Sequence, residues 1–188
     1  FLIVGREFSR KIRRRQDSAA AGLARKGIEA WAKLPKSDKK DQFNLAVLIE
    51  MRALVDDEPE KVLESLNKIE QKAIEEETKL SLNVRRALVW SRLKLFDRLG
   101  DSGLALSYVR QLAATGIPSW QLEYLYPWIS ERKNVSERYT LLRMVRPAVK
   151  DQPEMDRRFR AMMVETLLAQ NEVEKAYDEA LEFAKIYP

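Results

Sequence analysis

Residues 78–118 read TKLSLNVRRALVWSRLKLFDRLGDSGLALSYVRQLAATGIP, and this stretch decides the fold class. Its apolar side chains recur three and four residues apart, which places them on one face of an α-helix. Gly100 interrupts the pattern where a helix commonly ends in a left-handed residue, and Asp101 or Ser102 can cap a second helix that ends at Gly116. The stretch therefore predicts two helices joined by a short turn. The apolar positions of the two helices are Leu80, Val84, Ala87, Leu88, Leu95, Leu99, Leu104, Ala105, Tyr108, Val109 and Leu112.

The same spacing continues on both sides of this stretch, with short interruptions. Gly 6 and Pro 7 are low counts for 188 residues, and no segment has the pattern of a strand. The sequence predicts an all-α fold, an α-solenoid of stacked antiparallel helical hairpins. The expected helices begin at Asp17 or Ser18, Ser37 or Asp38, Pro59, Thr78, Asp101 or Ser102, Pro118, Ser136, Pro153 and, after a turn at Gln170-Asn171, Val173.

Two of the expected helices have a distinctive feature. Pro127 lies inside the helix that begins at Pro118, where a proline should kink or divide it. The last helix carries a stripe of six apolar residues at helical spacing. This stripe consists of Val173, Ala176, Tyr177, Ala180, Leu181 and Ala184.

Two segments, Arg86–Pro118 and Arg157–Pro188, share one spacing of turn and small residues. In the first, Gly100 in the turn is followed five positions later by Ala105; in the second, a turn asparagine is followed five positions later by Ala176. Each segment closes with a proline, and the two alanines are 71 residues apart, close to two periods of about 34 residues.

This spacing resembles the tetratricopeptide (TPR) repeat, over residues 38–188. The tryptophan and leucine-glycine signature of that family is absent. The resemblance implies stacked helical hairpins whose first helices form a concave groove for another protein or peptide. By this phasing the groove residues are Trp90, Lys94 and Asp97 in one hairpin and Arg158, Ala161 and Glu165 in another. Trp90 equally fits a core position.

A run of aromatic residues surrounds Pro127. Exposed aromatic side chains near arginine are typical of protein interfaces, whereas core packing is the alternative role of such large side chains. Both roles remain open from the sequence. The candidate interface residues of this run are Trp120, Tyr124 and Trp128.

The composition bears on chemistry as well as on fold. Cys and His are both absent, which excludes Cys/His zinc sites, thiol nucleophiles and a Ser-His-Asp triad. No pair of carboxylates stands out among the 29 acidic residues. The sequence therefore predicts a protein that is not an enzyme and that holds no cofactor or metal. A carboxylate enzyme is the least favoured alternative.

The net charge of +5 comes from the amino-terminal residues. Residues 1–16 hold six basic residues and one acid, and the other 172 residues hold 28 of each. The segment starts FLIVG, so residues 1–16 are expected to be the end of a membrane span or a basic juxtamembrane arm, followed by a helical-repeat domain over 17–188. A solvated helix start and a nucleic-acid-binding arm are the alternatives. The basic residues are Arg6, Arg10, Lys11, Arg13, Arg14 and Arg15.

These features together favour a membrane-tethered adaptor on the cytoplasmic face of a membrane. Such an adaptor would dock a partner protein within a larger envelope assembly for secretion, pilus formation or exopolysaccharide export. Its basic arm would lie on an anionic membrane surface. A nucleic-acid-associated helical repeat protein is the second hypothesis, but the neutral charge of residues 17–188 argues against it.

Overall fold

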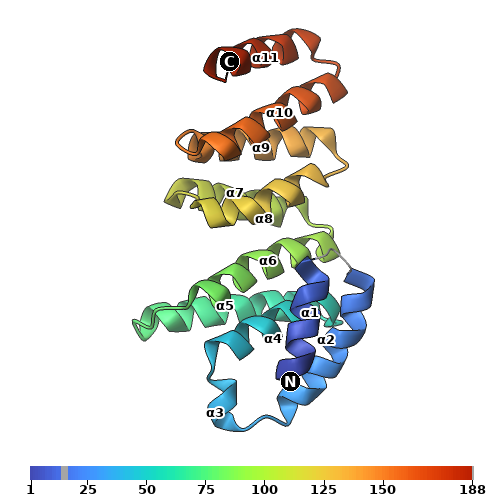
Figure 1. Ribbon diagram of the computed structural model, residues 1–188, viewed down its shortest axis with the longest axis vertical. Helices are drawn as coiled ribbons and strands as arrows, with labels where there is room; N and C mark the ends of the chain where they lie inside the picture. The colour runs from blue at the N-terminus through green and yellow to red at the C-terminus, as the bar shows by residue number, and fades with distance from the viewer. Residues whose placement is uncertain (14–16, 188) are drawn as a thin grey trace. The chain divides into compact units, whose positions relative to one another are not determined.

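The computed structural model describes residues 1–13 and 17–187 (Figure 1). These residues form α-helices and short connections, with no strand among them, and this confirms the all-α fold class. The chain divides into two compact units, Phe1–Gly100 and Asp101–Pro188. The boundary lies within Arg86–Pro118, the stretch that the sequence predicts as one hairpin.

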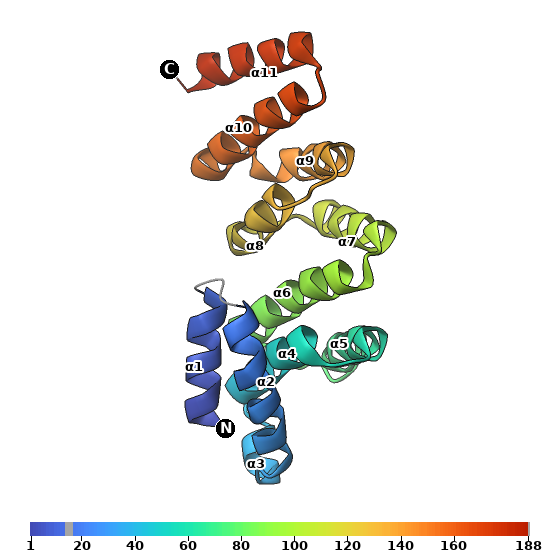
Figure 2. The same cartoon turned by 90° about the vertical axis from the view of Figure 1, so that its right-hand side faces the viewer.

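The first unit is built around α4. In Figure 2, α1 and α2 run side by side, and both pack against α4, which also packs against α5 and α6. The helices of this unit are α1 (Leu2–Arg13), α2 (Asp17–Ala32), α3 (Lys36–Lys39), α4 (Gln42–Val55), α5 (Pro59–Glu75) and α6 (Leu82–Leu99).

Local signals set the ends of these helices. Pro59 is the first residue of α5, and Gly100 ends α6 with φ 64°, as the sequence predicts. Two starts differ from the prediction. The carboxylate of Asp41, and not Ser37 or Asp38, accepts the N-cap hydrogen bond of α4, because α3 occupies the earlier residues. The cap of α6 is Ser81 instead of Thr78.

Two apolar clusters share α4 as their common wall. One joins α4, α5 and α6 through nine buried residues. The other surrounds Phe8 of α1, whose side chain is fully buried. The first cluster contains Ala46, Ile49, Ala53, Val62, Leu66, Val84, Ala87, Leu88 and Leu95, and the second contains Phe8, Ala20, Ala24, Val47 and Met51.

Two arginines of α6, the buried Arg92 and the exposed Arg98, connect the helices of the first unit. The Arg92 guanidinium is buried and donates to both Glu70 oxygens at 2.8 and 2.6 Å, which joins α6 to α5. Arg98 donates to the carbonyl of Ala53 at 2.9 Å and to that of Asp56, so it satisfies carbonyls at the end of α4. These contacts fasten α6 to both of its neighbours.

The second unit is built around α9 and α10. Helix α9 packs against α7, α8 and α10, and α10 also packs against α8 and α11. Pro127 lies inside α8 without dividing it. Asn134 caps α9 by accepting from the N–H groups of Ser136 and Glu137, so α9 begins before the predicted Ser136. The helices of this unit are α7 (Ser102–Thr115), α8 (Ser119–Ser130), α9 (Val135–Val149), α10 (Pro153–Ala169) and α11 (Val173–Ile186).

Helix α11 buries only part of the apolar stripe that the sequence predicts. Ala176 is 2% exposed on the side of α11 that meets α10, and Glu179 is buried on that side too. Val173, Tyr177 and Leu181 of the same stripe are exposed. The buried face of α11 is therefore rotated away from the centre of its apolar stripe.

Candidate protein-binding site

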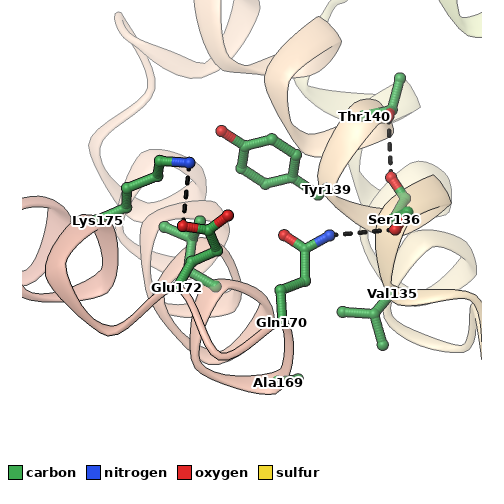
Figure 3. Close-up of a pocket in the computed structure, with 9 residues that line it drawn as sticks. Val135, Ser136, Tyr139, Thr140, Ala169, Gln170, Glu172 and Lys175 are labelled. Carbon is green, nitrogen blue, oxygen red and sulfur yellow. Dashed lines mark hydrogen bonds and ion pairs between the residues drawn. The ribbon is translucent and has the colours of Figure 1, made fainter.

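A cleft of about 580 Å³ opens in the second unit where α9 begins and where α10 turns into α11 (Figure 3). Side chains from all three helices form its walls. Most of them carry hydrogen-bonding groups, and Leu167 contributes an apolar surface. The lining residues are Val135, Ser136, Tyr139, Thr140, Leu167, Ala169, Gln170, Glu172 and Lys175.

Local structure places these side chains. The Asn134 cap starts α9, so Ser136, Tyr139 and Thr140 lie within one turn on the same side of that helix. On the opposite wall, Asn171 adopts the left-handed conformation with φ 61° and turns the chain from α10 into α11. The sequence predicts this turn, but it does not show that the turn lies opposite the start of α9.

One hydrogen bond between the lining residues connects the two walls of the cleft. Gln170 Nε2 donates to Ser136 Oγ at 3.4 Å, which joins the α10–α11 turn to α9. Lys175 Nζ lies 3.1 Å from Glu172 Oε2, and Figure 3 shows this pair on the far wall with the Tyr139 ring between the two walls. The cleft therefore presents an aromatic ring among paired polar groups.

A second cleft of about 440 Å³ continues the first along α9 and α11. The two share Tyr139, Leu167 and Lys175, so the three residues form a common middle section. In the second cleft, the Arg143 guanidinium lies 5.9 Å from the Tyr139 ring centroid. The two clefts adjoin at these three residues, and we call them together the α9–α11 channel.

A charged network reaches the second cleft through Arg146, Glu179 and Glu182, which line it. Arg160 is buried; its Nε lies 2.8 Å from Asp156 Oδ2, and its Nη1 lies 3.0 Å from Glu179 Oε1 and 3.2 Å from Glu182 Oε1. Arg146 of α9 binds the same two glutamates, with Nη1 at 2.8 Å from Glu179 Oε2. The network thereby ties α9, α10 and α11 together and holds the spacing of the channel walls.

The network also raises the pKa of two of its members, Arg160 and Tyr187. Burial alone lowers the pKa of the Arg160 guanidinium, but the hydrogen bond and charge of Asp156, with the charges of Glu182 and Glu179, outweigh burial and raise that pKa. Tyr187 donates its hydroxyl hydrogen to Asp156 Oδ2 at 2.7 Å, and this bond raises the pKa of the Tyr187 phenol. Both groups therefore keep their protons, as these hydrogen bonds require.

The groove residues predicted from the TPR phasing lie outside the channel. Trp90 is partly buried against the apolar cluster of α4, α5 and α6, and Lys94 lies 2.8 Å from Asp17 and 5.8 Å from the Trp90 ring centroid. Asp97 is exposed at the end of α6. In the second unit, Arg158 and Glu165 are exposed on α10, and Ala161 of the same helix is half-buried. Arg158 forms an ion pair with Glu154 at 2.7 Å.

The aromatic run of α8 also lies outside the channel. Trp128 is only 5% exposed, so it packs in the core, one of the two roles that the sequence left open. The Arg132 guanidinium covers its ring at 4.3 Å. Trp120 and Tyr124 are half-buried.

The sequence analysis does not identify the channel residues. The signal present in the sequence is Tyr139 with Arg143 four residues later, an aromatic–cation pair on one helix face.

The basic amino-terminal residues lie on a packed helix. Within α1, Arg6 and Arg10 are exposed, Lys11 is half-buried, and Arg10 pairs with Glu7 at 2.7 Å. The side chain of Arg13 and the whole of Arg14 and Arg15 lie outside the described residues. No helix in residues 1–13 and 17–187 has both the length and the apolar character needed to cross a membrane.

The described residues contain no group of three or more Asp and Glu side chains placed to hold a metal ion. Comparison of the chain with protein-family models, with curated proteins and with solved structures gives no match.

Proposed function

We propose that this protein is a non-enzymatic scaffold that binds a polypeptide segment of another protein in the α9–α11 channel. The observation that carries the proposal is that two open clefts adjoin at Tyr139, Leu167 and Lys175 along α9 and α11. Two adjoining open clefts suit a chain-like ligand, whereas small-molecule sites enclose most of their ligand.

The chemistry of the channel suits a peptide. Ser136, Gln170 and Thr140 offer hydroxyl and amide groups to a peptide backbone, and Leu167 with Met163 offers apolar surface for its side chains. Tyr139 beside Arg143 has the aromatic and guanidinium character that dominates the energy of many interfaces. We expect Tyr139 to be the main anchor.

Site-specific photo-crosslinking tests this proposal. In the first variant, a photoreactive phenylalanine analogue replaces Thr140, which is exposed and lines the channel. In the matched control variant, the same analogue replaces Thr115, which is exposed on α7 and does not line the channel. Irradiation of native cells should give a discrete adduct with one protein from position 140 only. Tyr139→Ala in the same chain should remove that adduct. Equal adducts at both positions, or none at position 140, would count against the proposal.

We propose further that the exposed side of α1 lies on an anionic membrane surface. Leu2 and Ile3 are 53% and 82% exposed, and the exposed Arg6 and Arg10 follow them on that side of the helix, opposite the buried Phe8. Apolar side chains next to cations are typical of helices that lie in the lipid headgroup region. This arrangement supports membrane binding by the folded first unit and does not require a separate flexible arm.

Vesicle binding tests the membrane proposal. The double variant Arg6→Glu, Arg10→Glu should bind phosphatidylserine-containing vesicles at least tenfold more weakly at near-physiological salt, since each cation near such a surface contributes about 1 kcal/mol. Arg25→Glu, Lys26→Glu, an exposed pair on α2, makes the same change of net charge and should keep most of the binding. Tight binding to RNA or DNA with no binding to vesicles would favour the nucleic-acid hypothesis instead.

The repeat character of the fold belongs to the same proposal. Ala176, which is 2% exposed where α11 meets α10, supports a TPR-like hairpin of these two helices. A scaffold of this kind, held at a membrane and occupied by a peptide segment, suits a subunit of an envelope assembly such as a secretion, pilus or exopolysaccharide exporter.

A further inference from the structure

Helix α11 has an apolar stripe on the side that faces solvent. Val173, Tyr177 and Leu181 are 58%, 66% and 37% exposed. They are spaced four residues apart and therefore line up along one side of the helix. We call these three residues the α11 stripe.

The α11 stripe is unusual among the outer faces of the second unit. The exposed side of α10, for example, carries the charged residues Glu154, Arg158 and Glu165, and Leu168 is a single exposed apolar residue near its end. Single exposed apolar residues are ordinary, but an aligned row of three on one helix marks a surface that another molecule covers. The opposite side of α11, with Lys175, Glu179 and Glu182, faces the α9–α11 channel, so the stripe and the channel are separate surfaces.

Two charges of opposite sign flank the stripe on one edge. Glu174 and Lys185 are both exposed and are eleven residues apart, which is three helical turns. They therefore lie on the same edge, with Glu174 near the first turn of α11 and Lys185 near the last. The small side chain of Ala180 borders the other edge, and Ala184 extends the stripe itself by one turn, so both leave room for a neighbouring helix.

We propose that the α11 stripe docks against the α11 stripe of a second copy of this chain, with the two helices antiparallel about a two-fold axis. A two-fold axis perpendicular to both helices places the same edges together and reverses their direction. Glu174 of one copy then lies beside Lys185 of the other, and the pair occurs twice. Tyr177 of each copy packs next to Leu181 of the other in the centre.

The charge pattern selects a second copy over an anionic membrane as the occupant. Glu174 and Asp178 are both exposed beside the stripe, and anionic headgroups would repel them. A second copy neutralises the charge of Glu174, because Lys185 of that copy lies at the same level along the antiparallel helix. A single helix pair is small beside the 1,200–2,000 Å² or so that stable interfaces bury, so we expect a weak, concentration-dependent dimer.

Sedimentation equilibrium of the full chain tests this proposal. The wild-type chain should show a rising dimer fraction between about 10 μM and 1 mM, and Tyr177→Glu should be monomeric throughout. Tyr177 is largely exposed, so this variant should keep its fold, which circular dichroism checks. Glu165→Lys, an exposed change on α10, should dimerise as the wild type does. A wild-type chain that is monomeric up to 1 mM overturns the proposal.

Charge exchange tests the antiparallel arrangement. Glu174→Lys and Lys185→Glu should each weaken the dimer several-fold, and the double variant should recover most of the wild-type affinity. Each single change also opposes the helix dipole, and the double variant carries both of these penalties. Recovery therefore reports on pairing between copies and not on helix stability. A double variant weaker than either single variant overturns the antiparallel register.

Discussion

Replacing Phe8 with alanine is expected to destabilise the first unit by about 3–5 kcal/mol, the usual cost of truncating a buried phenylalanine. The Phe8 side chain is fully buried among Ala20, Ala24, Val47 and Met51, so its removal leaves a cavity between α1, α2 and α4. Gly5, one turn earlier, has no side chain, and a Cβ there would lie 3.1 Å from Val47. The backbone of α1 therefore already lies close to α4 at Gly5, and this limits how far α1 can move to fill the cavity.

Hydrogen exchange of backbone amides in α2 and α4 measures this effect within the first unit. Phe43→Ala is the control, because Phe43 is 42% exposed on α4 and its truncation should cost much less. Equal losses of protection in the two variants would contradict the packing of α1.

The same packing implies that removal of residues 1–16 uncovers Val47 and Met51. Membrane binding is therefore better tested by substitution of Arg6 and Arg10 than by truncation.

Replacing Arg160 with methionine is expected to destabilise the second unit by about 3–5 kcal/mol, because the change leaves buried carboxylates without their cation. Asp156 and Glu179 are 3% and 8% exposed, and Arg160 contacts both. Tyr187 still donates to Asp156, and Arg146 still contacts Glu179, but neither replaces the guanidinium that bridges the two carboxylates.

Hydrogen exchange of the backbone amides in α9, α10 and α11 measures this loss of stability. The matched control is Arg158→Met on the same helix, since Arg158 pairs with Glu154 in solvent and such a pair contributes about 0–1 kcal/mol. Arg160→Lys retains the charge without the planar guanidinium and should fall between the two. If Arg160→Met proved no worse than Arg158→Met, the network would not hold the walls of the channel. Photo-crosslinking from position 140 should also weaken in Arg160→Met.

Among the described residues, the sequence by itself determined the helices other than α1 and α3, and most of their ends. Apolar spacing, Pro59 and Pro153 at first helical turns, Asp101 as a cap and Gly100 as a left-handed terminator are local features, and each acts within a few residues. Where the prediction of a start was displaced, at Asp41, Ser81 and Asn134, a nearby polar residue of the same kind supplied the cap. The all-α class followed from these local signals.

Only the tertiary structure decided which side of each helix meets a neighbour. Apolar spacing shows that a helix has an apolar side, but not how far a neighbouring helix covers it. Glu179 is buried because Arg146 and Arg160 lie beside it, and this rotates Tyr177 of α11 into solvent. Phe8 is buried because α2 and α4 lie against α1. The α9–α11 channel is formed by residues more than 30 positions apart, and no local spacing records that they meet.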